Sequence, residues 1–154
     1  MKLTNKQVSF LLLGIVVVLY AAKRANLPLG IRYNNPLNIR YNPANNWQGA
    51  TGVNARGFVI FDKPENGIRA AAKVLKSYAR QGVNRLGPIL IKWAPPTENK
   101  TLSYISHVEE LTGISSHDVV SQKDYTRLLA AMIRHENANY VYPELVVQNG
   151  VLAA

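Results

Sequence analysis

Apolar residues divide the chain into a short uncharged stretch and a longer body with helical and strand periodicities. From Val8 to Ala22 the sequence reads VSFLLLGIVVVLYAA, with Lys2 and Lys6 before it and Lys23-Arg24 after it. A membrane-spanning helix usually needs about 20 apolar residues, and lysines that reach toward the interface extend the usable length. We therefore expect residues 1–25 to be an N-terminal transmembrane anchor, in contact with lipid through residues 8–22.

Two other interpretations of this segment stay open. A cleaved signal peptide has the same basic start and apolar run, but it needs small residues at −3 and −1 of the cut, and Tyr20-Ala21-Ala22 puts a tyrosine at −3. A buried core helix would have to be apolar on all sides, and Val8–Tyr20 has no polar face apart from Ser9. Basic residues at both ends leave the membrane orientation undecided.

Residues 26–154 predict one further domain, mainly α-helical with a small β-hairpin. Asn and Pro residues favour turns over Asn34–Asn46, and three glycines followed by Phe58–Phe61 predict a hairpin within Trp47–Phe61. Apolar spacing and end signals predict helices after Asp62 as far as Gly82, over Pro88–Trp93, over Thr101–Thr112, and from a capping box at Ser121–Asp124 to about Asn137. The weakly apolar tail, Leu145–Ala154, stays unassigned.

Composition narrows the chemistry of this domain. With no cysteine among 154 residues, the chain has no disulfide, thiolate zinc site or cysteine nucleophile, and its three histidines lack metal-ligand spacing, so we expect no cofactor. Outside the four cations that flank the apolar stretch, 14 basic residues face 9 acidic ones, a surplus of five. That surplus favours an anionic polymer as partner, such as cell-wall glycopeptide, anionic lipid or nucleic acid. Nucleic acid is the minor hypothesis, because no binding motif for it is present.

The remaining chemistry is that of carboxyl groups, which is typical of glycoside cleavage by a carboxylic acid. Such an acid must keep its proton near neutral pH, so its surroundings must raise its pKa. Glu65 is expected at a helix N-terminus, which has the opposite effect on a carboxyl pKa, and Glu98 lies in a Pro-rich loop. Asp62 and Asp124 have the positions of helix caps.

Glu136 differs from these carboxylates because it ends an apolar helix, where the helix dipole disfavours negative charge and raises a carboxyl pKa. His135, Asn137, Asn139, Tyr140 and Tyr142 lie beside it in sequence, and such polar and aromatic groups suit a sugar-binding cleft. A solvent-facing glutamate at a frayed helix end is the alternative. We take Glu136 as the candidate catalytic acid.

Several motifs resemble those of phage virion-associated lysis proteins, which are described as virion structural proteins or lysozyme-like endolysins. The resemblance covers Gly30 to Tyr142, and its motifs are GIRYNNPLNIR at Gly30–Arg40, Trp47–Gly49, Gly57–Asp62, Gly67–Ala70, Trp93–Thr101, Tyr104-Ile105 and Ile133–Asn137. It implies that residues 26–154 form a lysozyme-like, peptidoglycan-degrading domain. Virion proteins would then be possible partners, beside the glycan strands of peptidoglycan.

A fainter similarity links the domain to bacterial wall-degrading glucosaminidases and lytic transglycosylases. In those enzymes a helix ending in the catalytic glutamate precedes an Asn-Asn turn, a β-hairpin and another helix. Here the turn at Asn34–Arg40, the hairpin and the helix come first, so the similarity implies a circularly permuted lysozyme-like fold with Glu136 in the catalytic position. No second catalytic carboxylate matches, so the implied mechanism uses one acid. Glu136 would protonate the glycosidic oxygen and then act as base toward the muramyl C6 hydroxyl.

Polar and aromatic residues within these motifs are the candidates for sugar binding, because sugars pack on aromatic faces and hydrogen-bond to amides. They are Asn35, Asn38, Arg40, Trp47, Tyr104 and Tyr140. Core packing is the alternative for the aromatic members, and a structural role in the turn is the alternative for the asparagines.

The expected function is a membrane-anchored phage muramidase or lytic transglycosylase that cleaves glycan strands during genome entry or host lysis. It would sit in a virion membrane or in the host inner membrane, facing the cell wall. One rival is a non-catalytic structural membrane protein of the virion that has a lysozyme-like body. Another is a membrane-tethered binder of glycan or nucleic acid, attracted by the basic body.

Overall fold

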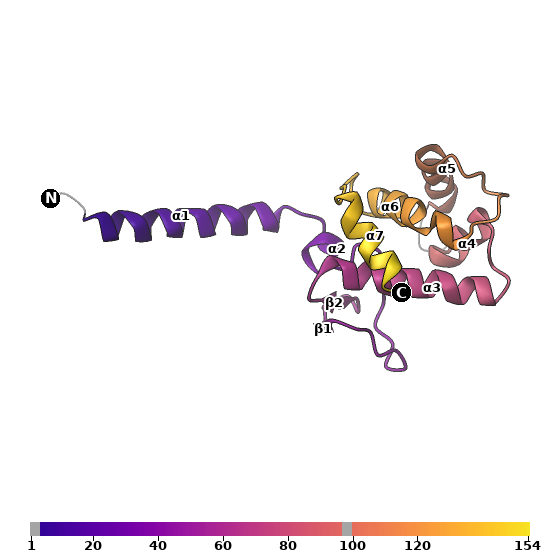
Figure 1. The fold of residues 1–154 in the computed structure, drawn as a ribbon, viewed down its shortest axis with the longest axis horizontal. Coiled ribbons are helices and arrows are strands. Elements are labelled where there is room, and N and C mark those ends of the chain that lie inside the picture. Colours follow the sequence, from indigo (N-terminus) through magenta and orange to yellow (C-terminus); the bar gives the residue numbers. More distant parts are fainter. Residues whose placement is uncertain (1–3, 97–99) are drawn as a thin grey trace.

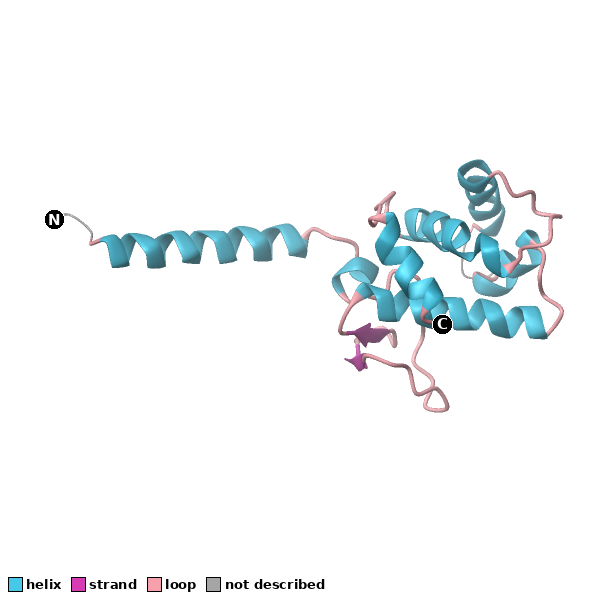
Figure 2. Ribbon diagram, viewed as in Figure 1, coloured by secondary structure: helices cyan, strands magenta, loops and turns pink. Residues whose placement is uncertain are grey.

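The computed structural model describes residues 4–96 and 100–154, which form one extended helix followed by a helical body with a small sheet (Figures 1 and 2). The helices are α1 (Asn5–Ala25), α2 (Leu29–Arg32), α3 (Pro64–Arg80), α4 (Leu86–Trp93), α5 (Thr101–Thr112), α6 (Tyr125–Glu136) and α7 (Glu144–Leu152), and the strands are β1 (Ala50–Val53) and β2 (Val59–Phe61). This composition agrees with the prediction of a mainly helical chain with a hairpin and an apolar N-terminal helix.

Helix α1 extends away from the body and leaves its apolar side chains exposed (Figure 1). Phe10, Leu13 and Val18, for example, are each at least 60% exposed. The interpretation of this segment as a core helix of the body therefore fails. By length and composition, Val8–Ala25 is the one candidate membrane span among the described residues, a test that a signal sequence near an N-terminus also passes.

The predicted hairpin is an antiparallel pair of short strands that begins after the Asn-rich turn. Val53 pairs with Val59 and Ala50 with Phe61, with an irregular register between Ala50 and Gly52. Val59 and Phe61 of β2 are buried, whereas all four residues of β1 are exposed, so one strand anchors the hairpin to the core. The connector before the turn is not entirely irregular, because it contains the single helical turn α2.

The core forms where α3, α4, α5 and α6 bring their apolar faces together. Ile68, Leu75, Leu86, Leu90 and Val108 are fully buried, and α6 adds the buried Leu128, Leu129, Met132 and Ile133. The buried residues of α3 and α6 recur at the 3.6-residue spacing that puts side chains on one face of a helix, whereas Leu102 of α5, expected on the apolar face, is 81% exposed. Because most of the face of α6 is fixed in this way, the position of its last residue, Glu136, is set by packing.

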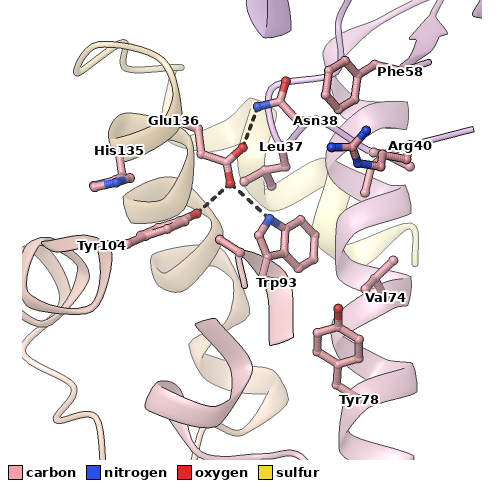
Figure 3. A pocket seen from close by; sticks show the side chains of 12 residues that line it. Leu37, Asn38, Arg40, Phe58, Val74, Tyr78, Trp93, Tyr104, His135 and Glu136 are labelled. Atoms are coloured by element: carbon pink, nitrogen blue, oxygen red, sulfur yellow. Dashed lines mark hydrogen bonds between the residues drawn. The ribbon is translucent and has the colours of Figure 1, made fainter. Parts of the chain in front are cut away.

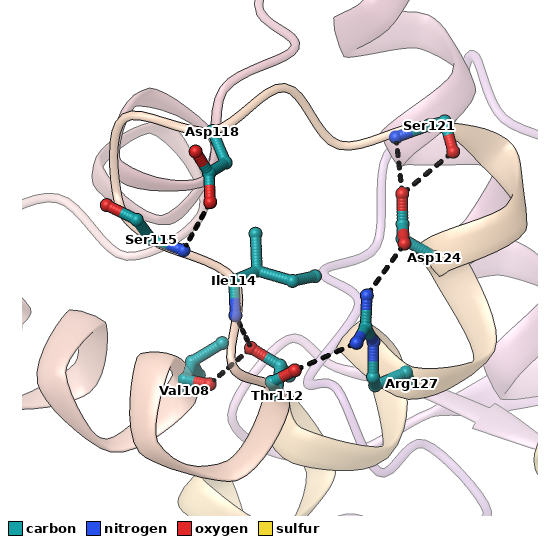
Figure 4. Close-up of polar contacts among 8 residues, drawn as sticks. All are labelled: Val108, Thr112, Ile114, Ser115, Asp118, Ser121, Asp124 and Arg127. Carbon is teal, nitrogen blue, oxygen red and sulfur yellow. Dashed lines mark hydrogen bonds and ion pairs between the residues drawn. The ribbon is translucent and has the colours of Figure 1, made fainter.

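Polar contacts at the connection from α5 to α6 fix how these two helices meet (Figure 4). Gly113, with a φ of 67°, ends α5 in the left-handed conformation that glycine adopts without strain. The predicted capping box is present, since Asp124 Oδ2 accepts hydrogen bonds from the backbone N and the Oγ of Ser121. Arg127 joins the two sides by donating to the Thr112 carbonyl at 3.0 Å and pairing with Asp124 at 2.8 Å.

Two sequence interpretations are corrected by the structure. The unassigned tail forms α7, which packs along α3 with Val147 and Gly150 buried (Figure 1). Asp62 does not cap α3, because Lys63 holds the N-cap position. Its carboxylate instead accepts a hydrogen bond from Asn66 Nδ2 at 2.7 Å.

Candidate functional site

An open cleft of about 750 Å³ lies between α3, the ends of α4 and α6, α5 and the Asn34–Arg40 turn. Aromatic side chains form much of its wall: Phe58, Tyr78, Trp93 and Tyr104 (Figure 3). Tyr78 and Trp93 contact each other edge to face, with ring centroids 6.4 Å apart. Glu136 points into this space from the last residue of α6.

Three side-chain donors from three different elements hold the Glu136 carboxyl group (Figure 3). Oε1 accepts hydrogen bonds from Tyr104 OH at 2.7 Å and from Trp93 Nε1 at 3.0 Å, and Oε2 accepts one from Asn38 Nδ2 at 2.8 Å. Both lone pairs of Oε1 are therefore occupied, whereas Oε2 has one left. A proton on this carboxyl group accordingly belongs on Oε2.

Burial among these groups raises the pKa of Glu136 above its ordinary value. The hydrogen bonds from Tyr104, Asn38 and Trp93 act in the opposite direction, because they stabilise the charged form, but they are the smaller effect. The sequence argument expected the same direction from the helix C-terminus. Burial is the main cause in the structure.

The Asn-rich turn is fixed against the end of α6 by two buried amides. Asn35 donates to the carbonyls of Ile39 and Val59 and accepts from Ile39 N, at 2.7 to 2.9 Å. Asn137 donates to the carbonyl of Pro36 at 2.7 Å and so joins the turn to the residue after Glu136. Asn38, held at a φ of 52°, is thereby aimed at the Glu136 carboxyl group.

A pair of histidines lies behind Tyr104. The Nδ1 atoms of His107 and His135 are 3.0 Å apart, so one ring donates and the other accepts. The His135 ring stacks on the Tyr104 ring with a centroid separation of 4.0 Å. Burial, and secondarily the nearby His107, lowers the pKa of His135, which favours the neutral ring that this hydrogen bond needs. No group of three potential metal ligands occurs among the residues described.

The six predicted sugar-binding residues are divided among four places. Asn38, Arg40 and Tyr104 line the cleft with Glu136. Asn35 is buried inside the turn, so it is a structural residue and its assignment to the cleft was wrong. Trp47 lines a neighbouring cavity. Tyr140 packs against the core and, edge to face, against Tyr142, so it too lies away from the described cleft.

Sequence reasoning missed Trp93, Tyr78 and Phe58 as cleft residues, whereas His135, noted there as a neighbour of Glu136, does line the cleft. Trp93 carried a usable signal, since it ends an apolar helix just before Ala-Pro-Pro, as Glu136 ends α6. Tyr78 packs against the core from α3, and its ring also faces the cleft (Figure 3).

Among the residues that the structure describes, Glu136 is the one carboxylate lining the cleft. Glu65 lies in the first turn of α3, as expected, and outside the lining set. Glu98, the other candidate considered, lies outside the described residues.

Comparison with known proteins associates the chain with bacteriophages. It is 37% identical over 91 residues to Protein P5 of Pseudoalteromonas phage PM2, an alignment that covers 57% of this chain and 57% of that protein. The chain thus spans little more than half the length of the curated relative it matches. No protein-family model matches the sequence.

Proposed function

We propose that the chain is a membrane-anchored phage enzyme that cleaves the glycan strands of peptidoglycan, with Glu136 as the general acid. The observation that carries this proposal is a carboxyl group of raised pKa, held by three donors at the wall of an aromatic cleft. A raised pKa keeps more of the acid form near neutral pH, and aromatic faces and amides are the groups that bind sugars.

In this proposal Glu136 serves both halves of one reaction. The proton on Oε2 passes to the glycosidic oxygen as the bond from that oxygen to the anomeric carbon breaks. The resulting carboxylate then takes the proton of the muramyl C6 hydroxyl, whose oxygen bonds to the anomeric carbon and closes a 1,6-anhydro ring. Atoms and charge balance without a water molecule or a second carboxylate. Having Glu136 as the one described carboxylate of the cleft supports this route over a two-carboxylate hydrolysis.

The proposed fold is a circularly permuted lysozyme-like domain. In the enzymes it resembles, an Asn-Asn turn follows the glutamate helix directly. Here that turn lies about a hundred positions earlier in the chain, yet its Asn38 contacts Glu136 and its Pro36 carbonyl accepts from Asn137. This arrangement supports a permutation that has changed the connections and kept the contact.

The proposed anchor is α1, with the body facing the cell wall from a virion membrane or from the host inner membrane. The exposed apolar surface of α1 and the similarity to a phage protein support this location. The same two observations also favour the second candidate function, a structural membrane protein of the virion without catalysis. Cleavage of peptidoglycan by the chain would distinguish the enzyme from the structural protein.

The test is release of soluble fragments from purified peptidoglycan by the full chain in a non-ionic detergent. Glu136→Gln keeps the shape of the side chain and removes the acid, so it should lower the rate by at least about 100-fold. Glu144→Gln, an exposed change on α7, should leave the rate unchanged and serves as the matched control. Full activity of Glu136→Gln would exclude Glu136 as the acid. No release by folded wild type would favour the structural protein.

A further inference from the structure

A second cavity, of about 590 Å³, adjoins the Glu136 cleft on the other side of Val74 and Tyr78. These two residues are one helical turn apart on α3, as Figure 3 shows, and they line both spaces. The far wall of the second cavity is the loop before β1, with Trp47 as its aromatic residue. The two spaces therefore adjoin along α3, with Val74 and Tyr78 as their shared wall.

Three cations and several amide and hydroxyl side chains are among the residues that line this second cavity. Arg69, Lys73 and Arg80 lie within about 40° of one another around α3, since their spacings of four and eleven residues return to one face of a helix. Within residues 4–96 and 100–154 no carboxylate lines this cavity. Trp47 adds an aromatic side chain to this wall, and Lys73 and Arg80 are exposed on it. Such a wall suits a ligand that brings carboxylates.

We propose that this second cavity binds the free carboxylates of the short peptides attached to the glycan strand, beside the sugar-binding cleft at Glu136. This inference rests on the proposed function, because it names the part of the same substrate that the cavity takes. Lys73 and Arg80 are exposed cations that supply the charge. Arg69 supplies charge while its Nε donates to the Ala153 carbonyl at 2.8 Å.

The wall of Val74 and Tyr78, which both cavities share, favours peptide carboxylates over a lipid headgroup as the ligand of the second cavity. A glycan strand held at Glu136 carries its peptides as side branches, and a branch leaving the cleft past Val74 and Tyr78 enters the second cavity directly. Anionic lipid would need no such connection to the cleft. Nucleic acid is disfavoured for the same reason, and because the three cations of the cavity lie on one face of a single helix within twelve residues.

The experiment measures binding to the full chain carrying Glu136→Gln, so that no ligand is consumed. The ligands are a disaccharide–tripeptide with free carboxylates and the same compound with its carboxylates amidated. We expect the free form to bind at least about tenfold more tightly, and Lys73→Gln with Arg80→Gln to remove that preference. Lys123→Gln with Arg56→Gln makes the same charge change elsewhere on the exposed surface and should preserve it.

Equal binding of the two ligands, or a preference that survives Lys73→Gln with Arg80→Gln, would overturn this proposal. So would tighter binding of a short-chain phosphatidylglycerol than of the tripeptide ligand, which would make the cavity a headgroup site. Because the readout is binding by a variant without the acid, it is independent of cleavage. Failure of wild type to cleave peptidoglycan overturns the proposed function and leaves the binding result standing.

Discussion

Burial disfavours the charged form of Glu136 and raises its pKa, and three hydrogen-bond donors partly offset this effect. Tyr104, Trp93 and Asn38 come from α5, α4 and the Asn-rich turn, so the carboxyl environment depends on the packing of the whole body. The sequence singled out Glu136 from its place at the end of an apolar helix, and the structure places it at the wall of the cleft. The sequence held no information on which donors would meet Glu136, because all three lie at least 32 positions away.

The pair Asn35 and Asn38 shows the limit of sequence reasoning at this scale. Both belong to one asparagine-rich motif, and both were predicted to bind sugar. Asn35 turns inward and satisfies backbone groups of Ile39 and Val59, whereas Asn38 turns outward to Glu136. Their opposite orientations follow from backbone conformation, including the positive φ of Asn38, which composition and spacing do not reveal.

Replacing Tyr104 with Phe should raise the pKa of Glu136 further. The tyrosine hydroxyl stabilises the carboxylate, and phenylalanine keeps the ring stacked on His135 while removing that donor. The measurement is a carbon-13 NMR titration of labelled glutamate carboxyls, with the Glu136 signal identified by its loss in Glu136→Gln. Tyr142→Phe, outside the cleft, should leave the titration unchanged. A lower or unaltered pKa in Tyr104→Phe would contradict the assigned role of this hydrogen bond.

The same titration has a consequence for stability, with a definite sign. Because the pKa of Glu136 is raised in the folded protein, the folded state holds its proton to higher pH than the unfolded chain. Protonation of Glu136 therefore stabilises the folded state. Its contribution to the free energy of unfolding is complete below the pKa of the unfolded chain, about 4.3, and is lost as pH rises through the pKa of the folded protein. The stability of wild type relative to Glu136→Gln should therefore decline over that window. A rise would contradict the burial argument.

At the scale of the elements, periodicity and end signals were sufficient for the hairpin and for α3, α4, α5 and α6. Strong signals such as Gly113 and the Ser121–Asp124 box mark real helix ends. Periodicity and end signals did not predict α7, because its nine residues contain Gly150 and lack a clear apolar face. This helix is stabilised by its contact with α3, which local sequence does not encode.

Gly150 tests that explanation of α7. A Cβ at this position would lie 2.7 Å from Ile68 Cβ and 2.9 Å from the Glu65 carbonyl oxygen. Gly150→Ala should therefore destabilise the protein by about 1–3 kcal/mol, although the same change in a free helix stabilises it by up to about 1 kcal/mol. Asn149→Ala, at the exposed neighbouring position, is the control for helix propensity in chemical denaturation. A stabilised Gly150→Ala would show that α7 does not depend on close contact with α3.

At the scale of the whole molecule, the chain joins an exposed apolar helix to a basic body with a grooved surface. The apolar stretch was evident from composition, because a run of that length needs no tertiary information. The two cavities were not, since the loop with Trp47 and the end of α6 come to lie beside α3 only in the folded body. Long-range contacts of this kind join residues about a hundred positions apart.

Membrane insertion of α1 should depend on its uninterrupted apolar centre. Leu12→Arg with Val16→Arg places two charges there, at a cost of about 5 kcal/mol or more on insertion scales. We expect wild type to stay with the membrane fraction after an alkaline carbonate wash, and the double variant to move to the supernatant. Leu12→Val with Val16→Leu keeps the composition and should behave as wild type. Release of wild type by the wash would contradict the anchor.

The most direct test of the central claim is the mass of the glycan ends that the full chain generates from purified peptidoglycan. The single-acid mechanism predicts 1,6-anhydromuramyl ends from wild type and none above background from Glu136→Gln, at equal folded concentrations. Reducing ends in place of anhydro ends would retain cleavage but contradict the single-acid route. No new ends from folded wild type would contradict the account of Glu136 as the acid of a glycan-cleaving enzyme.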